Sequence, residues 1–111
     1  MSENSIYEFL LNLPLLEVTK VALDKHHLVI NCRSKLGGGI CPCCQQKTDV
    51  VNQRYTRLVS DLSMSGRNVL LQLEVRQFYC SVCDRYFSEQ FDFVSEHSHT
   101  TTRQAKWIFM L

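Results

Sequence analysis

Two cysteine pairs with the same spacing constrain this chain more than any other feature. Cys41 and Cys44 have two residues between them, as do Cys80 and Cys83, and 35 residues separate the pairs in a chain of 111. Zinc binds four thiolates tetrahedrally, and a two-residue gap lets one tight turn direct both sulfurs at the same ion. The sequence therefore predicts one Zn(II) site with Cys41, Cys44, Cys80 and Cys83 as its ligands. Four thiolates leave zinc no open position for water or substrate, so we expect a structural site and no catalytic residues.

Three disulfides in a secreted domain are the alternative use of the six cysteines. The N-terminus does not resemble a secretory signal, because no basic segment precedes its apolar stretch and Glu8, Asn12 and Pro14 interrupt that stretch. We therefore expect a cytoplasmic protein with reduced thiols. No apolar stretch reaches the roughly 18 residues that a membrane-spanning helix needs, so we expect no membrane partner.

Other cysteines and histidines fit the metal site less well. Cys43 is an alternative ligand to Cys44, but only Cys44 reproduces the gap of the second pair, so we predict that Cys43 is a bystander. Cys32 ends an apolar run and is predicted to be a small buried hydrophobe. His97 and His99 have one residue between them, whereas a finger with two cysteine and two histidine ligands needs three to five. We expect surface or core histidines.

Before the first cysteine pair, the pattern predicts a helix and a hairpin. Residues 5–11 have helical character, with Ile6, Phe9 and Leu10 on one face that must pack against something. The runs 18–23 and 28–32 are apolar and partly β-branched, and the polar connection between them favours a β-hairpin. Three consecutive glycines at 37–39 permit positive φ angles on the way into the first cysteine turn.

Between the cysteine pairs, residues 49–58 and 68–80 are predicted strands joined through 61–66. Apolar residues alternate with polar or mixed ones over 68–76, which is typical of a half-buried strand. A strand that delivers Cys80 into a turn, followed by a return strand from Tyr86, indicates a zinc ribbon. We expect the aromatic residues around the second pair to pack about the metal and exclude water rather than to stack on bases. They are Phe78, Tyr79, Tyr86, Phe87, Phe91 and Phe93. Residues 102–111 are predicted to begin a helix behind a run of threonine caps.

We therefore predict a small α+β, mostly β protein. It would contain an N-terminal short helix and β-hairpin over 1–36, a four-cysteine zinc-ribbon domain over 37–94, and a linker with the start of a C-terminal helix over 95–111.

The distribution of charge permits contact with nucleic acid. The formal net charge is only +1, but residues 33–85 carry eight Lys or Arg against four Asp or Glu. Arg54, Arg57, Arg67 and Arg76 are the candidates for DNA contact. Each is alternatively a solvated or salt-bridged surface arginine, and Arg57 alternatively pairs with Asp61. The aspartates of this chain are expected at turns or on the surface, which applies to Asp49, Asp61, Asp84 and Asp92.

Several short motifs carry a resemblance to a known family. In order they are Leu13-Pro14, Cys41-Pro42-x-Cys44, Tyr55-x-Arg57, Asp61-Leu62, Val75-Arg76-x-Phe78-x-Cys80-x2-Cys83 and Phe87-x-Glu89. Together they resemble the N-terminal zinc-binding region of ISL3-family transposases over nearly the whole chain. The sequence departs from the family pattern at Gln45, where a glycine commonly follows the cysteine turn, and at Ser63 and Gln77.

This resemblance implies a role in DNA transposition in a bacterial cytoplasm. Such a module helps to recognise the terminal inverted repeats of an insertion sequence. In the family a helix-turn-helix follows the zinc region, so the resemblance implies that residues 95–111 are a linker and the start of a truncated helix-turn-helix. A catalytic domain with three acidic metal ligands comes later in the family. The present chain lacks that domain, so we expect no enzymatic activity from it. The alternative is a zinc-stabilised protein-interaction or dimerisation module, or a truncated transposase remnant, without DNA binding. Homo-oligomers are compatible with either.

Overall fold

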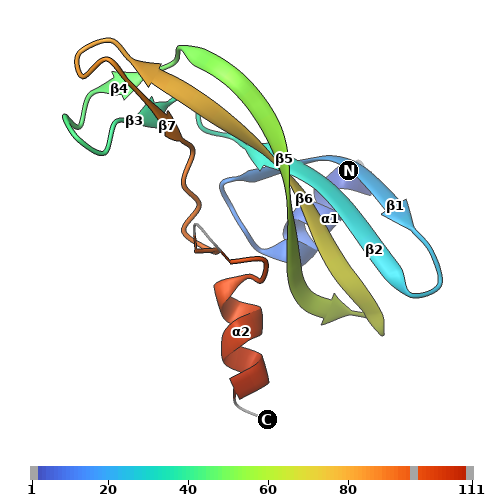
Figure 1. Ribbon diagram of the computed structural model, residues 1–111. Helices are drawn as coiled ribbons and strands as arrows, with labels where there is room; N and C mark the ends of the chain where they lie inside the picture. Colours follow the sequence, from blue (N-terminus) through green and yellow to red (C-terminus); the bar gives the residue numbers. More distant parts are fainter. Residues whose placement is uncertain (1–2, 96–97, 110–111) are drawn as a thin grey trace.

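The computed structural model describes residues 3–95 and 98–109, and its strands dominate the molecule (Figure 1). His97, Met110 and Leu111 lie outside the described residues. The elements, in chain order, are α1 (Glu3–Leu11), β1 (Leu16–Leu23), β2 (His27–Ser34), β3 (Gly39–Ile40), β4 (Lys47–Thr48), β5 (Val51–Met64), β6 (Arg67–Cys80), β7 (Arg85–Ser88) and α2 (Thr102–Phe109).

Strand β6 is the centre of the main sheet. It pairs antiparallel with β5 along most of its length, and β2 pairs parallel with its first half, from His27↔Asn68 to Arg33↔Glu74. Strand β7 pairs antiparallel with its last residues, where Cys80 lies opposite Arg85. Strand β1 completes the sheet by pairing antiparallel with β2, and β3 and β4 form a separate two-stranded sheet. One strand therefore joins the N-terminal hairpin to the cysteine turns.

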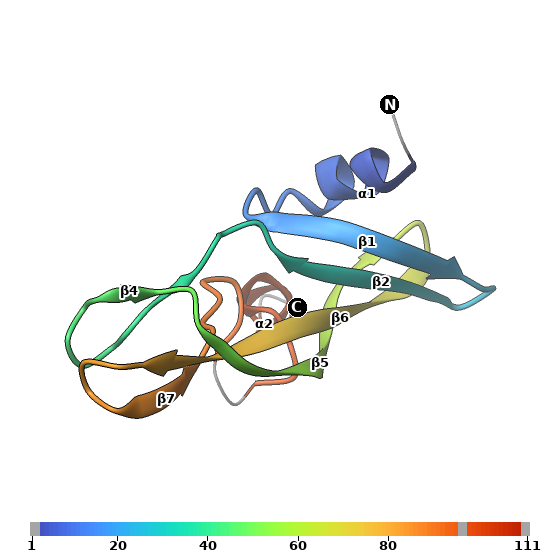
Figure 2. The ribbon, with the colours of Figure 1, turned by 90° about the horizontal axis from the view of Figure 1, so that it is seen from above.

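The hydrophobic core lies on one face of the main sheet. Alternate residues of β6 are buried, as the period-two pattern predicts, and they are joined by apolar residues of β1, β2 and β5. The alternating set on β6 is Val69, Leu71, Leu73 and Val75. Each such side chain contributes roughly 1.5–3 kcal/mol on burial. Figure 2 shows α1 lying along β1, and Leu11 of this helix is part of the core.

The helix α1 packs through a different face from the one we predicted. Ile6, Phe9 and Leu10 are 48%, 81% and 50% exposed, so the predicted apolar stripe faces away from the sheet. The face that meets the sheet combines polar and apolar side chains, namely those of Asn4, Tyr7, Glu8 and Leu11. The two polar members bond to β1, because Asn4 contacts the Thr19 carbonyl oxygen and Glu8 accepts a hydrogen bond from the Val18 amide. Sequence hydrophobicity alone does not reveal these polar anchors.

The other predicted elements are present. The hairpin is β1 and β2, and the two long strands are β5 and β6, although β5 extends to Met64 and the turn between them is correspondingly tight. Helix α2 begins at Thr102, as expected. The domain boundaries at 36/37 and 94/95 stay predictions, and hydrogen bonds between β2 and β6 cross the first of them. Among the described residues, no helix combines the length and apolar character needed to cross a membrane.

Gly38 and Gly39 serve close packing, and the predicted positive φ angles are absent from residues 37–39. The described glycine with a positive φ is Gly66, in the β5–β6 turn, where φ is 77°. A Cβ added at Gly38 would lie 2.6 Å from the Thr48 carbonyl oxygen, and one added at Gly39 would lie 2.7 and 2.8 Å from ring atoms of Phe78. A Cβ at Gly37 meets nothing within 4 Å. The glycines thus let β3 approach β4 and the Phe78 ring.

A pair of alanine substitutions tests this account. Gly39→Ala is expected to destabilise the protein by about 1–3 kcal/mol, because the buried Phe78 ring must shift to admit the methyl group. Gly37→Ala is the matched control and should change stability by less than about 1 kcal/mol, because its site is open. Urea unfolding followed by circular dichroism measures both, and equal losses for the two variants would contradict the packing role.

Candidate metal centre

Each cysteine pair lies in a tight turn between two antiparallel strands. The first turn joins β3 to β4, where Ile40 pairs with Lys47, the Cys41 amide bonds to the Gln46 carbonyl oxygen (2.9 Å) and the Gln45 amide bonds to the Cys41 carbonyl oxygen (2.9 Å). The second turn joins β6 to β7, where Cys80 pairs with Arg85. Both turns therefore have the same construction.

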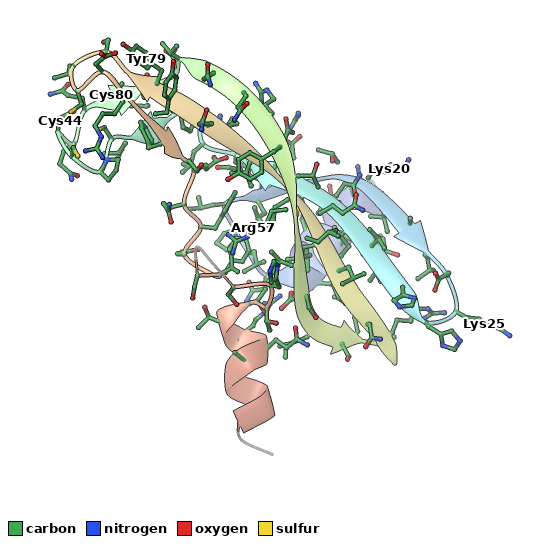
Figure 3. All side chains as sticks on the ribbon, viewed as in Figure 1. Lys20, Lys25, Cys44, Arg57, Tyr79 and Cys80 are labelled. Atoms are coloured by element: carbon green, nitrogen blue, oxygen red, sulfur yellow. The ribbon has the colours of Figure 1, made fainter. Side chains whose placement is uncertain are left out.

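The two turns bring four sulfur atoms together. The Sγ atoms of Cys41 and Cys83 are 3.9 Å apart, those of Cys44 and Cys80 are 3.5 Å apart, and all four lie within 4.8 Å of one another. A tetrahedral zinc ion with Zn–S bonds of about 2.3 Å requires sulfurs about 3.8 Å apart, which these separations match. Figure 3 shows Cys44 and Cys80 at the same end of the molecule. The arrangement is a four-cysteine metal-binding site, and its separations are well beyond the 2.05 Å of a disulfide.

The residue after each pair has a left-handed backbone. Gln45 has φ of 63° and Asp84 has φ of 51°, and each directly follows the second cysteine of its turn. This conformation turns the chain back toward the next strand, and it favours glycine because other residues suffer a steric cost there. The glycine that commonly stands at position 45 in the resembling family has a physical explanation in this angle.

The thiols of this cluster cannot all ionise at the same pH without a cation. Hydrogen bonds from the Cys44 and Cys43 backbone amides lower the pKa of Cys41 to about 6, against the effect of burial. The hydrogen bond shared with Cys44, together with burial and the neighbouring thiols, raises the pKa of Cys83 to about 12. A divalent cation removes this conflict by taking the place of the protons, so metal binding releases protons.

Two pairs of aromatic side chains pack next to the second cysteine turn. Phe78 is fully buried and stacks against Phe87 with ring centroids 5.5 Å apart, and Tyr79 lies 5.3 Å from Tyr86. The Tyr79 amide also bonds to the Val50 carbonyl oxygen (3.0 Å).

Other aromatic residues from the predicted group lie elsewhere. Phe91 and Phe93 pack against the core of the main sheet. The prediction that all of these aromatic residues surround the metal is therefore wrong for Phe91 and Phe93.

The remaining cysteines lie outside the cluster. Cys43 is exposed and its sulfur accepts a hydrogen bond from Arg85, whereas Cys32 is 1% exposed and packs in the core. Burial raises the pKa of the Cys32 thiol to about 12. All six cysteines are free thiols, and His99 is exposed.

Two of the four arginines proposed to contact DNA pair with carboxylates. Arg76 and Glu89 form an ion pair of 2.6 Å with side chains only 14% and 7% exposed, and Arg76 also lies 5.0 Å from the Phe78 ring centre. Arg54 pairs with Glu74 at 3.1 Å on the exposed surface. The alternative of a salt-bridged arginine therefore describes both in this structure, and their contact with DNA stays a prediction.

The other two proposed arginines bind backbone carbonyls. Arg57 donates to the carbonyl oxygens of Ser95 and Ser98. The alternative prediction that Arg57 pairs with Asp61 is therefore wrong. Figure 3 places Arg57 between the main sheet and the segment that follows β7. Arg67 donates through Nε to the Asp24 carbonyl oxygen at 2.9 Å. The four arginines therefore do not form one cluster.

Asp61 is a buried residue that joins β5 to the start of α2, and the sequence analysis did not predict this role. It lies within β5, it is 2% exposed, and it accepts hydrogen bonds from Thr101 Oγ1 (2.7 Å) and Arg103 Nε (2.8 Å). Arg103 also donates to the Leu11 carbonyl oxygen at 2.7 Å. Burial raises the pKa of Asp61, but the hydrogen bonds from Arg103 and Thr101 outweigh that effect and keep the pKa below its ordinary value. An isolated aspartate in sequence suggests a turn, so only its distant partners could have revealed this role.

The fold and the cysteine geometry together define a zinc-ribbon protein. Residues 38–83 match the family model described as the zinc-finger of transposase IS204/IS1001/IS1096/IS1165, and this segment contains all four clustered cysteines. Residues 38–83 are thus an ISL3-family transposase zinc-binding region, as the motifs within this segment predict. No curated protein and no solved structure matches the chain.

Cysteine substitutions separate the ligands from the bystander. Cys44→Ser should lose the bound zinc, because serine keeps the shape of cysteine but does not supply a thiolate. Cys43→Ser should retain a full equivalent of zinc, because its sulfur points away from the cluster toward Arg85. Elemental analysis after gel filtration measures both variants. Zinc loss in Cys43→Ser with retention in Cys44→Ser would reverse the assignment.

Removal of the buried carboxylate should weaken the fold. Asp61→Asn is expected to cost about 3 kcal/mol, because it leaves the Arg103 guanidinium with an uncompensated charge. Glu74→Gln is the control at an exposed ion pair and should cost about 0–1 kcal/mol. Because the folded-state pKa of Asp61 is lowered, its contribution is complete above about pH 4 and is lost as the pH falls through that lowered value. Urea unfolding at neutral pH and in acid measures both effects, and equal costs would contradict the anchor role.

Proposed function

We propose that this chain is a zinc-stabilised, non-catalytic DNA-binding module of an ISL3-like transposase that helps to recognise insertion-sequence ends. The observation that carries the proposal is the match of residues 38–83 to a transposase zinc finger, together with the four converging sulfurs inside that segment. The target would be the terminal inverted repeats of the element. The cell compartment would be the bacterial cytoplasm, where free thiols stay reduced.

Zinc(II) is the proposed metal because its preferred ligands and geometry fit this donor set. Cys41, Cys44, Cys80 and Cys83 would hold it, and when bound it would cross-link β3 and β4 to the end of β6. Soft thiolate donors in a tetrahedral arrangement favour zinc or iron–sulfur centres over calcium and magnesium. The chain's own contribution is to present the four sulfurs from two turns whose strand pairs are already formed.

DNA contact would come from cationic side chains that meet phosphate groups. Phosphate contacts supply most of the non-specific affinity for DNA and position the protein on the duplex. Residues 33–85 carry twice as many basic as acidic residues, which supports such contact. Arg54, Arg57, Arg67 and Arg76 remain candidates, although each would have to keep or exchange its present partner.

A protein-interaction or dimerisation module is the second candidate function. The observation that favours it is the stripe of Ile6, Phe9 and Leu10 on the outer face of α1, which is at least 48% exposed at each position. Exposed apolar groups of this kind often mark protein contacts. In that case the chain would associate with itself or with another protein without touching DNA.

Salt dependence separates the two candidates. Binding of the zinc-loaded chain to a duplex carrying the element's terminal repeat should weaken by at least tenfold between about 50 and 200 mM salt if it makes several phosphate contacts. Apolar self-association should hold or strengthen over the same range. Fluorescence anisotropy of labelled DNA and analytical ultracentrifugation of the protein measure the two processes. Absence of DNA binding at low salt would exclude the first candidate.

A further inference from the structure

Most basic side chains in the described part of the chain are occupied by partners within the protein. Five lysines or arginines form ion pairs with carboxylates, Arg57 donates to two backbone carbonyls, and Arg67 donates to one through Nε. The five are Arg33, Lys35, Arg54, Arg76 and Arg103. The basic side chains that can meet a new anion at least cost are therefore a small subset, and their positions indicate where an anionic partner can bind.

Apart from Arg57 and the exposed Lys20 on β1, the lysines and arginines whose side chains the structure describes and that form no carboxylate ion pair fall into two groups at the two ends of the molecule. Lys47 and Arg85 flank the cysteine turns, and Lys25 and Arg67 lie at the β1–β2 and β5–β6 turns. Four thiolates with one divalent ion carry a net charge of about −2, which offsets the first pair of cations. The second pair has only the single carboxylate of Asp24 beside it. The end away from the cysteines is therefore the more attractive one for a polyanion.

The carboxylate at this far end, that of Asp24, contacts both its own backbone and the His27 ring, whose Nδ1 atom lies 3.5 Å from Asp24 Oδ1. Asp24 Oδ1 accepts hydrogen bonds from the backbone amides of His26 (2.8 Å) and His27 (2.7 Å). The bonds from these two amides, chiefly that of His26, lower the pKa of Asp24. Its charge is thus partly compensated by local amide dipoles, while the side chains of Lys25, His26 and His27 stay exposed.

Hydrogen bonds join the two turns into one unit. The Arg67 Nε atom donates to the Asp24 carbonyl oxygen (2.9 Å), and the Asn68 amide donates to the His26 carbonyl oxygen (2.9 Å). Parallel pairing of β2 with β6 begins at the same point, with His27 opposite Asn68. We call residues 24–27 together with residues 65–68 the paired-turn tip. Main-chain hydrogen bonds hold the backbone that carries the cationic and imidazole side chains. Binding of a ligand to these side chains therefore costs little backbone entropy.

We infer that the paired-turn tip contacts the phosphate backbone of duplex DNA through Lys25, Arg67 and the two histidines. Figures 1 and 3 show the β1–β2 hairpin, with Lys25 at its end, extending away from the cysteine turns. A two-stranded β-ribbon fits the width of the DNA major groove, and lysine, arginine and imidazole N–H groups are suitable donors to phosphate oxygens. The inference rests on the proposed DNA-binding function and names the surface that would serve it.

Two double variants with the same change in charge test the inference. Lys25→Gln/Arg67→Gln alters the paired-turn tip, and Lys47→Gln/Arg85→Gln alters the cysteine end. Each is made in the full 111-residue chain. Lys25→Gln alone is added because Arg67 also supports the turn.

Zinc content and thermal unfolding confirm that each variant is loaded and folded. The probe is a fluorescein-labelled duplex of about 30 base pairs carrying the terminal repeat, and anisotropy titrations at several salt concentrations give the affinity and its salt slope.

Loss of the tip cations should weaken binding at low salt by about tenfold. The slope of log affinity against log salt should become less steep by about 2, because two phosphate contacts are lost. Lys25→Gln should change the slope by about 1, and Lys47→Gln/Arg85→Gln should leave affinity within about twofold of the unmodified chain. Equal or larger losses in the cysteine-end variant, or undiminished binding in the tip variants, would overturn the inference while DNA binding itself stands. Failure of the unmodified chain to bind the duplex would instead remove the proposed function.

Discussion

The structure depends on the continuity of strand β6. This strand contributes four buried apolar residues to the core and ends at Cys80, so the same backbone that packs the sheet also positions the metal site. It pairs with β2, β5 and β7, which together bring distant parts of the sequence to its two edges. The core of the main sheet and the second cysteine turn are therefore parts of one strand.

The two ends of β6 are stabilised in different ways. Near Leu71 and Leu73 the sheet is held by apolar burial beneath α1, which is the dominant favourable term in folding. Near Cys80 the elements are short. Strands β3 and β4 have only two residues each, and the aromatic pairs Phe78–Phe87 and Tyr79–Tyr86 pack there. Such short strands bury little surface, so a metal cross-link has the most to contribute there. This contrast explains why the cysteines are concentrated at one end.

Local patterns in the sequence predict much of this fold and of the candidate metal site. The alternation along β6, the hairpin and the two cysteine turns follow from neighbouring residues, and the structure agrees with them. The parallel pairing of β2 with β6 joins segments about forty residues apart, so no local sequence pattern predicts it. The orientation of α1 depends on the polar bonds of Asn4 and Glu8, which a hydrophobic stripe does not reveal. Likewise, the partners of Asp61 and Arg76 come from distant segments, and a charged residue seen alone suggests the surface.

The bonds around Asp61 have a consequence for how helix α2 leaves the sheet. Thr101 and Arg103, at the start of the helix, are tied to a strand, and the Thr101 amide also bonds to the Ser60 carbonyl oxygen (2.9 Å). The helix then projects away from the sheet (Figure 1). Because residues at its start are hydrogen-bonded to β5, α2 cannot rotate freely about its first turn, and its direction follows from that of β5. A molecule that binds to α2 would therefore be held at a defined angle to the main sheet.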